Sequence, residues 1–195
     1  MRTFIARGGA TAWLWICPDA SGDGAELPPR GLRLATVAGG WQGGVRCSLP
    51  LPLAGESVAT VVLQHVLTRD DAGTRLLDEC ARVLVPGGRL GLLALNPLSP
   101  YRWRWRGAGL RAAEPLVWRR RLRAAGLVPS PVSQGIGPAW RETPSPEAQS
   151  GAGLRAAYLV LAEKRTFPLT PVRGHRARAA VPAALPAGGA FREHP

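Results

Sequence analysis

The stretch RVLVPGGRLGLLALNP, residues 82–97, constrains the fold more than any other part of the chain. An apolar-faced segment runs into Pro86, which cannot continue a helix, and two glycines then supply a turn. A continuous apolar run, residues 89–95, follows at once and is typical of a strand that is buried on both faces. The stretch therefore predicts a helix that starts near Asp70 and stops at Pro86, followed by a central strand of a sheet.

Further strand-like and helix-like segments lie on both sides of this unit. An amphipathic segment predicts a helix over 114–127 that ends at Gly126. Apolar and β-branched runs predict strands over 11–17, 31–37, 44–49, 57–67 and 155–165. Strands that alternate with helices indicate an α/β fold with an open, mostly parallel sheet. Because ligands bind such sheets outside the carboxyl ends of the strands, we expect one rim to be lined by residues 18–24, 47–50, 64–67 and 96–99.

The charge of the chain is strongly unbalanced. Its 195 residues include 25 basic and 13 acidic side chains, which give a formal net charge of +12. A charge this large attracts nucleic acid, anionic lipid or an acidic protein partner.

We assign residues 1–169 to one α/β domain. Residues 170–195 are rich in Pro, Ala and Arg, cannot bury an apolar face, and are expected to form a basic, disordered tail.

The cysteines and the hydropathy of the chain indicate the cellular compartment in which the protein works. Cys17, Cys47 and Cys80 lie far apart, and no Cys or His cluster has metal-ligand spacing, so neither a disulfide framework nor a zinc site is indicated. No apolar run approaches the roughly 20 residues that a membrane span requires. The apolar run at 12–17 is too short for a signal peptide. We expect a cytoplasmic protein without a membrane span.

Residues 51–97 resemble the second half of a class I S-adenosylmethionine-dependent methyltransferase of the type 11 subgroup. The motifs that carry the resemblance are Leu-Pro-Leu at 51–53, Gln-His-Val-Leu at 64–67 and Arg-Val-Leu-Val-Pro-Gly-Gly at 82–88. Arg165 to Thr170 also resembles the end of a reduced subgroup. The resemblance implies a Rossmann-like, mostly parallel α/β sheet with a shortened N-terminal half, S-adenosylmethionine as cofactor, and methyl transfer to an acceptor that the sequence does not identify.

The cofactor-binding half departs from that family. The family has an acid and a Gly-x-Gly loop after the first strand, an acid at the end of the second strand, and an acid that binds adenine. Here the second strand ends at 36–39 without an acid, and the adenine position falls near Cys47. A charged acceptor contributes about 1.5–3 kcal/mol per hydrogen bond, so the missing acids predict cofactor affinity that is weaker by about two to four decades. The resemblance places the cofactor on Asp19, Gly22, Gly24, Cys47, Ser48, Gln64 and His65.

Two polar residues at strand ends are candidates for chemistry. His65 is placed to act as a general base if the methyl acceptor is an oxygen; the alternative is a polar strand-end residue beside the cofactor. The segment NPLSPY at 96–101 is similar to the Asn-Pro-Pro-Tyr motif of enzymes that methylate amino groups, but it follows the fifth family strand rather than the fourth. The alternative for Asn96 is a simple strand terminator.

Arginines and tryptophans are interleaved beyond residue 101. This composition is typical of surfaces that track phosphates and stack on bases, and the alternative is a solvated helix face with tryptophans packed on the sheet. The candidates for nucleic-acid contact are Arg102, Arg104, Arg106, Arg119, Arg120 and Arg121. Two hypotheses follow: a methyltransferase with an atypical cofactor site, or a non-catalytic relative that acts as a basic scaffold for nucleic acid or protein.

Overall fold

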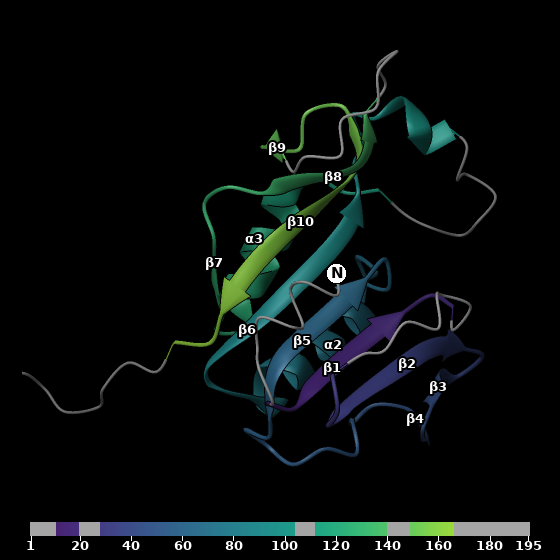
Figure 1. Ribbon diagram of the computed structural model, residues 1–195, viewed down its shortest axis with the longest axis vertical. Helices are drawn as coiled ribbons and strands as arrows, with labels where there is room; N and C mark the ends of the chain where they lie inside the picture. The colour runs from purple at the N-terminus through teal and green to yellow at the C-terminus, as the bar shows by residue number, and fades with distance from the viewer. Residues whose placement is uncertain (1–10, 20–27, 104–111, 140–148, 166–195) are drawn as a thin grey trace, which may run out of the picture.

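The computed structural model describes residues 11–19, 28–103, 112–139 and 149–165. Its ten strands form one sheet in the order β4-β3-β2-β1-β5-β6-β10-β8-β9, with β7 paired to β10 (Figure 1). The strands are β1 Trp13–Cys17, β2 Gly31–Val37, β3 Gly40–Gly43, β4 Arg46–Cys47, β5 Val58–Gln64, β6 Leu84–Leu95, β7 Val128–Pro129, β8 Gln134–Ala139, β9 Gln149–Ser150 and β10 Arg155–Glu163. The helices are α2 Asp71–Val83, the 3-10 helix η1 Pro100–Trp103 and α3 Pro115–Ala124.

Four parallel strands, β2, β1, β5 and β6, form the centre of the sheet. Gln64 lies opposite Leu93 in the register of β5 and β6, so the apolar runs at 57–67 and 89–95 are parallel neighbours in the sheet. Antiparallel strands flank this centre, with β3 and β4 beyond β2 and with β10 and β8 beyond β6. The expected Rossmann-like α/β sheet is therefore confirmed, with antiparallel edges.

The two α-helices, α2 and α3, pack on one face of the sheet. In Figure 1, α2 and α3 lie behind the strands. The larger core cluster joins apolar residues of these helices, such as Leu76 and Trp118, to strand residues such as Leu14 and Val61. The opposite face carries a smaller cluster of Trp13, Val62, Leu93 and Leu159. Alternation along each strand sends successive side chains to these two faces.

The first helix ends earlier than the sequence predicts. We expected α2 to continue to Pro86, but it ends at Val83, and β6 starts at Leu84 and runs through the Pro-Gly-Gly segment. A residue that precedes a proline is disfavoured in the helical region. Gly87 then adopts a φ of +76°, and its N–H donates to the carbonyl of Lys164 at 2.7 Å. Pairing with the end of β10 thus makes this segment part of the sheet.

The region after β2 also differs from the prediction. We expected the next strand over 44–49. Instead the chain turns at Gly39, where φ is +81°, and returns as β3 against β2. Only Arg46 and Cys47 form a further strand. This hairpin matters for the site because it carries Trp41 toward the carboxyl end of β2, where Trp41 pairs with Thr36.

The helix predicted over 114–127 is confirmed in position. α3 spans Pro115–Ala124, and Gly126 has a φ of +79°. The N–H of Leu127 donates to the carbonyl of Leu122 at 2.9 Å, which is the pattern of a helix closed by a left-handed glycine. The predicted tail at 170–195 lies outside the described residues.

Candidate functional site

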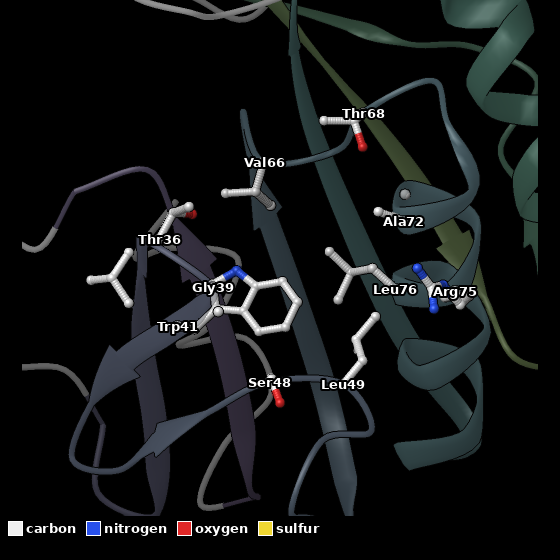
Figure 2. Close-up of a pocket in the computed structure, with 13 residues that line it drawn as sticks. Thr36, Gly39, Trp41, Ser48, Leu49, Val66, Thr68, Ala72, Arg75 and Leu76 are labelled. Carbon is white, nitrogen blue, oxygen red and sulfur yellow. The ribbon is translucent and has the colours of Figure 1, made fainter.

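A cavity of about 410 Å³ opens at the carboxyl ends of β2 and β5, beside the first turns of α2 (Figure 2). Small-molecule sites usually have volumes of about 300–1,000 Å³, so the cavity can take a ligand of nucleoside size or larger. The side chains and backbone that line it are Thr36, Val37, Gly39, Gly40, Trp41, Ser48, Leu49, Val66, Thr68, Ala72, Gly73, Arg75 and Leu76. It therefore lies on the predicted rim, close to the point where the strand order reverses between β1 and β5.

The lining combines an aromatic ring, apolar side chains and hydroxyls. Thr36, Ser48 and Thr68 supply hydroxyls, and Arg75 is the only ionisable side chain among the described lining residues. An adenine ring needs an apolar or aromatic slot, and ribose hydroxyls need hydrogen-bond partners. These residues fit a nucleoside, with neutral hydroxyls in place of the carboxylates that the resemblance led us to look for.

Trp41 forms a wall of the cavity and does not fill it. Figure 2 shows its indole in the middle of the view, near Val66, Leu49 and Leu76. The indole is half-buried against the main core. Trp13 and Trp15 do not line the cavity. The indole N–H of Trp13 donates to the carbonyl of Pro28 at 2.9 Å, and the indole N–H of Trp15 donates to Oε1 of Gln64 at 3.0 Å.

The start of α2 fixes one side of the cavity. The Asp70 carboxylate accepts a hydrogen bond from the Thr68 hydroxyl at 2.5 Å and another from the N–H of Gly73 at 3.1 Å. These bonds, the Thr68 bond first, lower the pKa of Asp70. A Cβ at Gly73 would lie 2.1 Å from the carbonyl oxygen of Thr68. Only glycine lets the helix approach this loop so closely, so the sequence Thr68–Gly73 sets the position of the cavity wall.

A salt bridge on α2 holds the loop at 51–53, which directly follows the cavity residues Ser48 and Leu49. Nη2 of Arg82 lies 2.8 Å from Oε2 of Glu79. The Arg82 guanidinium also donates to the carbonyls of Leu51 and Leu53 at 3.1 and 3.0 Å. The N–H of Leu51 donates to Oε2 of Glu79 at 2.9 Å. The Leu-Pro-Leu motif and the Arg of the Arg-Val-Leu motif are therefore bonded to each other, directly after Leu49 of the cavity.

We compared the sequence and the fold with those of known proteins. No protein-family model matches the sequence, and no curated protein is significantly similar to it. Among solved structures, an S-adenosylmethionine-dependent methyltransferase from Archaeoglobus fulgidus has 12% sequence identity and a TM-score of 0.56, over 84% of this chain and 92% of that chain. One from Thermotoga maritima has 21% identity and a TM-score of 0.50, over 59% of each chain. The present chain thus spans 59% of the length of the Thermotoga protein.

The fold is that of the S-adenosylmethionine-dependent methyltransferases. At these identities the likeness establishes the fold alone, and membership of the type 11 subgroup stays a prediction. The strand and the helix that the sequence predicted between residues 51 and 97 are β5 and α2 of this fold.

Of the residues assigned to the cofactor from the sequence, Ser48 lines the cavity. Cys47 precedes it and is half-buried, and burial raises the pKa of its thiol. Asp19 is exposed, and its carbonyl accepts from Nη2 of Arg33 at 3.3 Å. Gln64 faces Trp15 and does not line the cavity. Gly22 and Gly24 lie outside the described residues, so the assignment of this loop stays a prediction.

His65 lies at the end of β5 in an uncommon backbone conformation. Its φ is +54°, a region that few non-glycine residues adopt, and its N–H donates to the carbonyl of Leu93 at 3.0 Å. The ring borders a separate hollow of about 10 Å³ beside Trp118, which has room for about one water molecule. Burial lowers the pKa of His65 below its ordinary 6.5, so the imidazole is neutral near pH 7.

Asn96 has a structural role in this fold. Its side chain is almost fully buried, and its Nδ2 donates to the carbonyls of Gly153 and Arg155 at 2.8 and 2.9 Å, with a longer contact of 3.3 Å to that of Ala152. Its Oδ1 accepts from the N–H of Leu98 at 3.1 Å. Both ends of the amide are occupied, which favours the strand-terminator interpretation over a grip on a substrate amine.

Sequence reasoning missed most of the cavity wall. Trp41, Thr68 and Arg75 were not among the predicted site residues, although all three line the cavity. Thr68 directly follows the rim predicted at 64–67, and this position was its only signal. Trp41 carried none, because its position depends on the β2–β3 hairpin.

Proposed function

We propose that this protein is an S-adenosylmethionine-dependent methyltransferase of the type 11 kind, with the nucleoside part of the cofactor bound in the cavity beside α2. The observation that carries the proposal is the position of that cavity, at the carboxyl ends of β2 and β5 in a methyltransferase fold. S-adenosylmethionine supplies the methyl group.

The residues of the cavity have separate parts in this proposal. Trp41 and Leu76 hold the adenine ring between an aromatic and an aliphatic surface. Ser48 and Thr36 bond the ribose hydroxyls. Neutral hydroxyl partners contribute about 0.5–1.5 kcal/mol each, less than the roughly 1.5–3 kcal/mol of charged partners. We therefore expect micromolar to millimolar binding rather than the tighter binding of a site with carboxylates.

His65 is the proposed base for an oxygen acceptor. A buried imidazole with a lowered pKa is free to accept a proton at neutral pH. The strained backbone at His65 supports a functional interpretation, since such strain clusters at functional sites. A nitrogen or sulfur acceptor would need positioning alone, and His65 would then be dispensable.

Isothermal titration calorimetry of the full chain with S-adenosylmethionine and S-adenosylhomocysteine tests the cavity. Ala72 lines the cavity from α2 and is exposed, whereas Ala124 is an exposed alanine at the end of α3, outside the cavity. Ala72→Trp should abolish binding by filling the cavity, and the matched control Ala124→Trp should not change it. Absence of wild-type binding at millimolar ligand would reject the proposal. Equal affinities for both variants would place the ligand elsewhere.

The second candidate function is a non-catalytic, basic scaffold for nucleic acid. Arg120 is exposed on α3, and the chain's net charge of +12 supports it. Against it, Arg119 donates to the carbonyl of Ser130 at 3.0 Å, and Arg121 donates to the carbonyls of the loop at 68–69. RNA retention across a salt series tests this function, because phosphate contacts produce a steep salt dependence.

The proposed compartment is the cytoplasm. Cys17, Cys47 and Cys80 are all free thiols, which suits a reducing environment. Among the helices of the described segments, none is both long enough and apolar enough to cross a membrane.

A further inference from the structure

The three most exposed large apolar side chains of the described residues lie on two neighbouring loops. Leu98 is 72% exposed, Trp103 58% and Leu154 57%. Leu98 and Trp103 belong to the segment that leaves the carboxyl end of β6 through η1, and Leu154 immediately precedes β10. Figure 1 shows η1 and the start of β10 at the top of the molecule, at the same end of the sheet. We call Leu98, Trp103 and Leu154 the apolar tip.

Hydrogen bonds join the two loops that carry the apolar tip. The hydroxyl of Ser99, itself buried, donates to the carbonyl of Leu154 at 3.2 Å. Asn96 bonds the carbonyls of 152, 153 and 155 from the same loop and the N–H of Leu98. Because the backbone on both sides of each leucine is held in this way, the exposure of these side chains follows from the fold itself.

Among the described residues of the two loops, 96–103 and 151–154, the only charged side chain is the arginine Arg102. The guanidinium of Arg102 stacks over the ring of Trp103 at 5.0 Å from its centre. Arg104, Arg106 and Arg111 follow in the sequence but lie outside the described residues, as do Glu142 and Glu147. Leucine and tryptophan side chains next to arginines are the composition that binds the headgroup region of anionic bilayers.

We propose that the apolar tip docks on an anionic lipid surface, with Leu98, Trp103 and Leu154 inserted among the lipids and Arg102 at the headgroups. Exposed leucines have no role in binding phosphates or bases, whereas they add directly to insertion into a bilayer. Arg102 already covers one face of Trp103, which leaves less of that ring for stacking on a base. The net charge of +12 draws the chain to the surface, and the apolar side chains hold it there.

Co-sedimentation of the full chain with vesicles tests the proposal. We expect binding to phosphatidylcholine vesicles that contain 30% phosphatidylglycerol (our choice of probe), weaker binding to pure phosphatidylcholine, and a decrease as salt rises. The double variant Leu98→Asp with Leu154→Asp should bind about a hundredfold less well, roughly tenfold for each leucine.

A matched control distinguishes vesicle binding by the apolar tip from non-specific binding by other exposed apolar side chains. Val45 and Val132 are 44% and 52% exposed and lie outside the two loops, so Val45→Asp with Val132→Asp should bind vesicles as the wild type does. Circular dichroism confirms that both variants fold. The proposal is overturned if the wild type does not bind anionic vesicles, if both double variants lose binding equally, or if single-stranded RNA displaces the vesicles and binds the leucine variant as tightly as the wild type.

Discussion

Asn96 offers the sharpest test of the structure because its amide joins two segments that are far apart in sequence. Replacing Asn96 by Ala removes two short hydrogen bonds to the carbonyls of 153 and 155, one long contact to that of 152, and one bond from the N–H of Leu98. Three good bonds at about 0.5–1.5 kcal/mol each give about 3 kcal/mol. Water reaches part of this loop and replaces some of the loss, so we expect Asn96→Ala to lower the free energy of unfolding by about 2–3 kcal/mol.

Asn96→Asp keeps the shape and reverses the chemistry. One carboxylate oxygen can still accept from the N–H of Leu98, but the other faces three carbonyl oxygens, which cannot donate. The folded state therefore favours the protonated acid, and the pKa of the new Asp rises above its unfolded value of about 3.9. With a raised folded pKa, the folded state binds more protons, so stability is highest below about pH 4 and falls as pH rises, by up to about 1.4 kcal/mol per pH unit.

Urea denaturation of the wild type and both variants at several pH values between 4 and 7 measures this. The gap between wild type and Asn96→Asp should widen with pH by about 2–4 kcal/mol across that range. The gap for Asn96→Ala should stay nearly constant, which makes it the matched control. A pH-independent gap for the Asp variant would show that its carboxylate does not face the carbonyls, and the hydrogen bonds assigned to Asn96 would then be wrong.

Three further predictions concern the site and its support. Glu79→Gln should lower Tm at neutral pH; because the hydrogen bond from Arg82 lowers the pKa of Glu79 below its ordinary 4.5, this difference should be fully present above pH 4.5 and vanish in melts at lower pH. Gly73→Ala should destabilise the protein by about 1–3 kcal/mol, since its Cβ would lie 2.1 Å from the Thr68 carbonyl, and should weaken S-adenosylmethionine binding in calorimetry. His65 should titrate below pH 6.5 by NMR, and the wild type should lose stability relative to His65→Gln as pH falls through that range.

The parallel centre of the sheet was predictable because its strands carry a strong local signal. The runs in β5 and β6 are apolar on both faces, and the Pro-Gly-Gly segment between α2 and the rest of β6 allows few alternatives. The exact end of α2 was not predictable from the helical pattern, since Leu84 fits the apolar face of a helix and also the sheet that it joins. Tertiary pairing with Val58 decides between them.

The candidate site was less predictable because its parts come from four separate segments. The rim at 47–50 and 64–67 followed from topology, and Ser48, Leu49 and Val66 do line the cavity. The hairpin that brings Trp41 to the rim has only a two-residue turn at 38–39 as its signal, and Ala-Gly is a weak one beside Asn-Gly or Asp-Gly. Arg75 looked like any exposed helix residue, because nothing in the sequence indicates which helix face borders a cavity.

The bonds of Arg82 explain why the sequence resemblance predicts the fold of this chain better than it predicts the chemistry of the cavity. The guanidinium holds the Leu51 and Leu53 carbonyls and the Glu79 carboxylate, so the motif residues that carried the resemblance are occupied by one another. Leu51, Leu53, Glu79 and Arg82 do not line the cavity, whereas Val66 of the Gln-His-Val-Leu motif does. A chain can therefore keep these motifs for stability while the cavity exchanges carboxylates for hydroxyls and an arginine. The proposed binding of S-adenosylmethionine in this cavity depends on Trp41, Ser48 and Arg75, and none of these three residues belongs to the motifs.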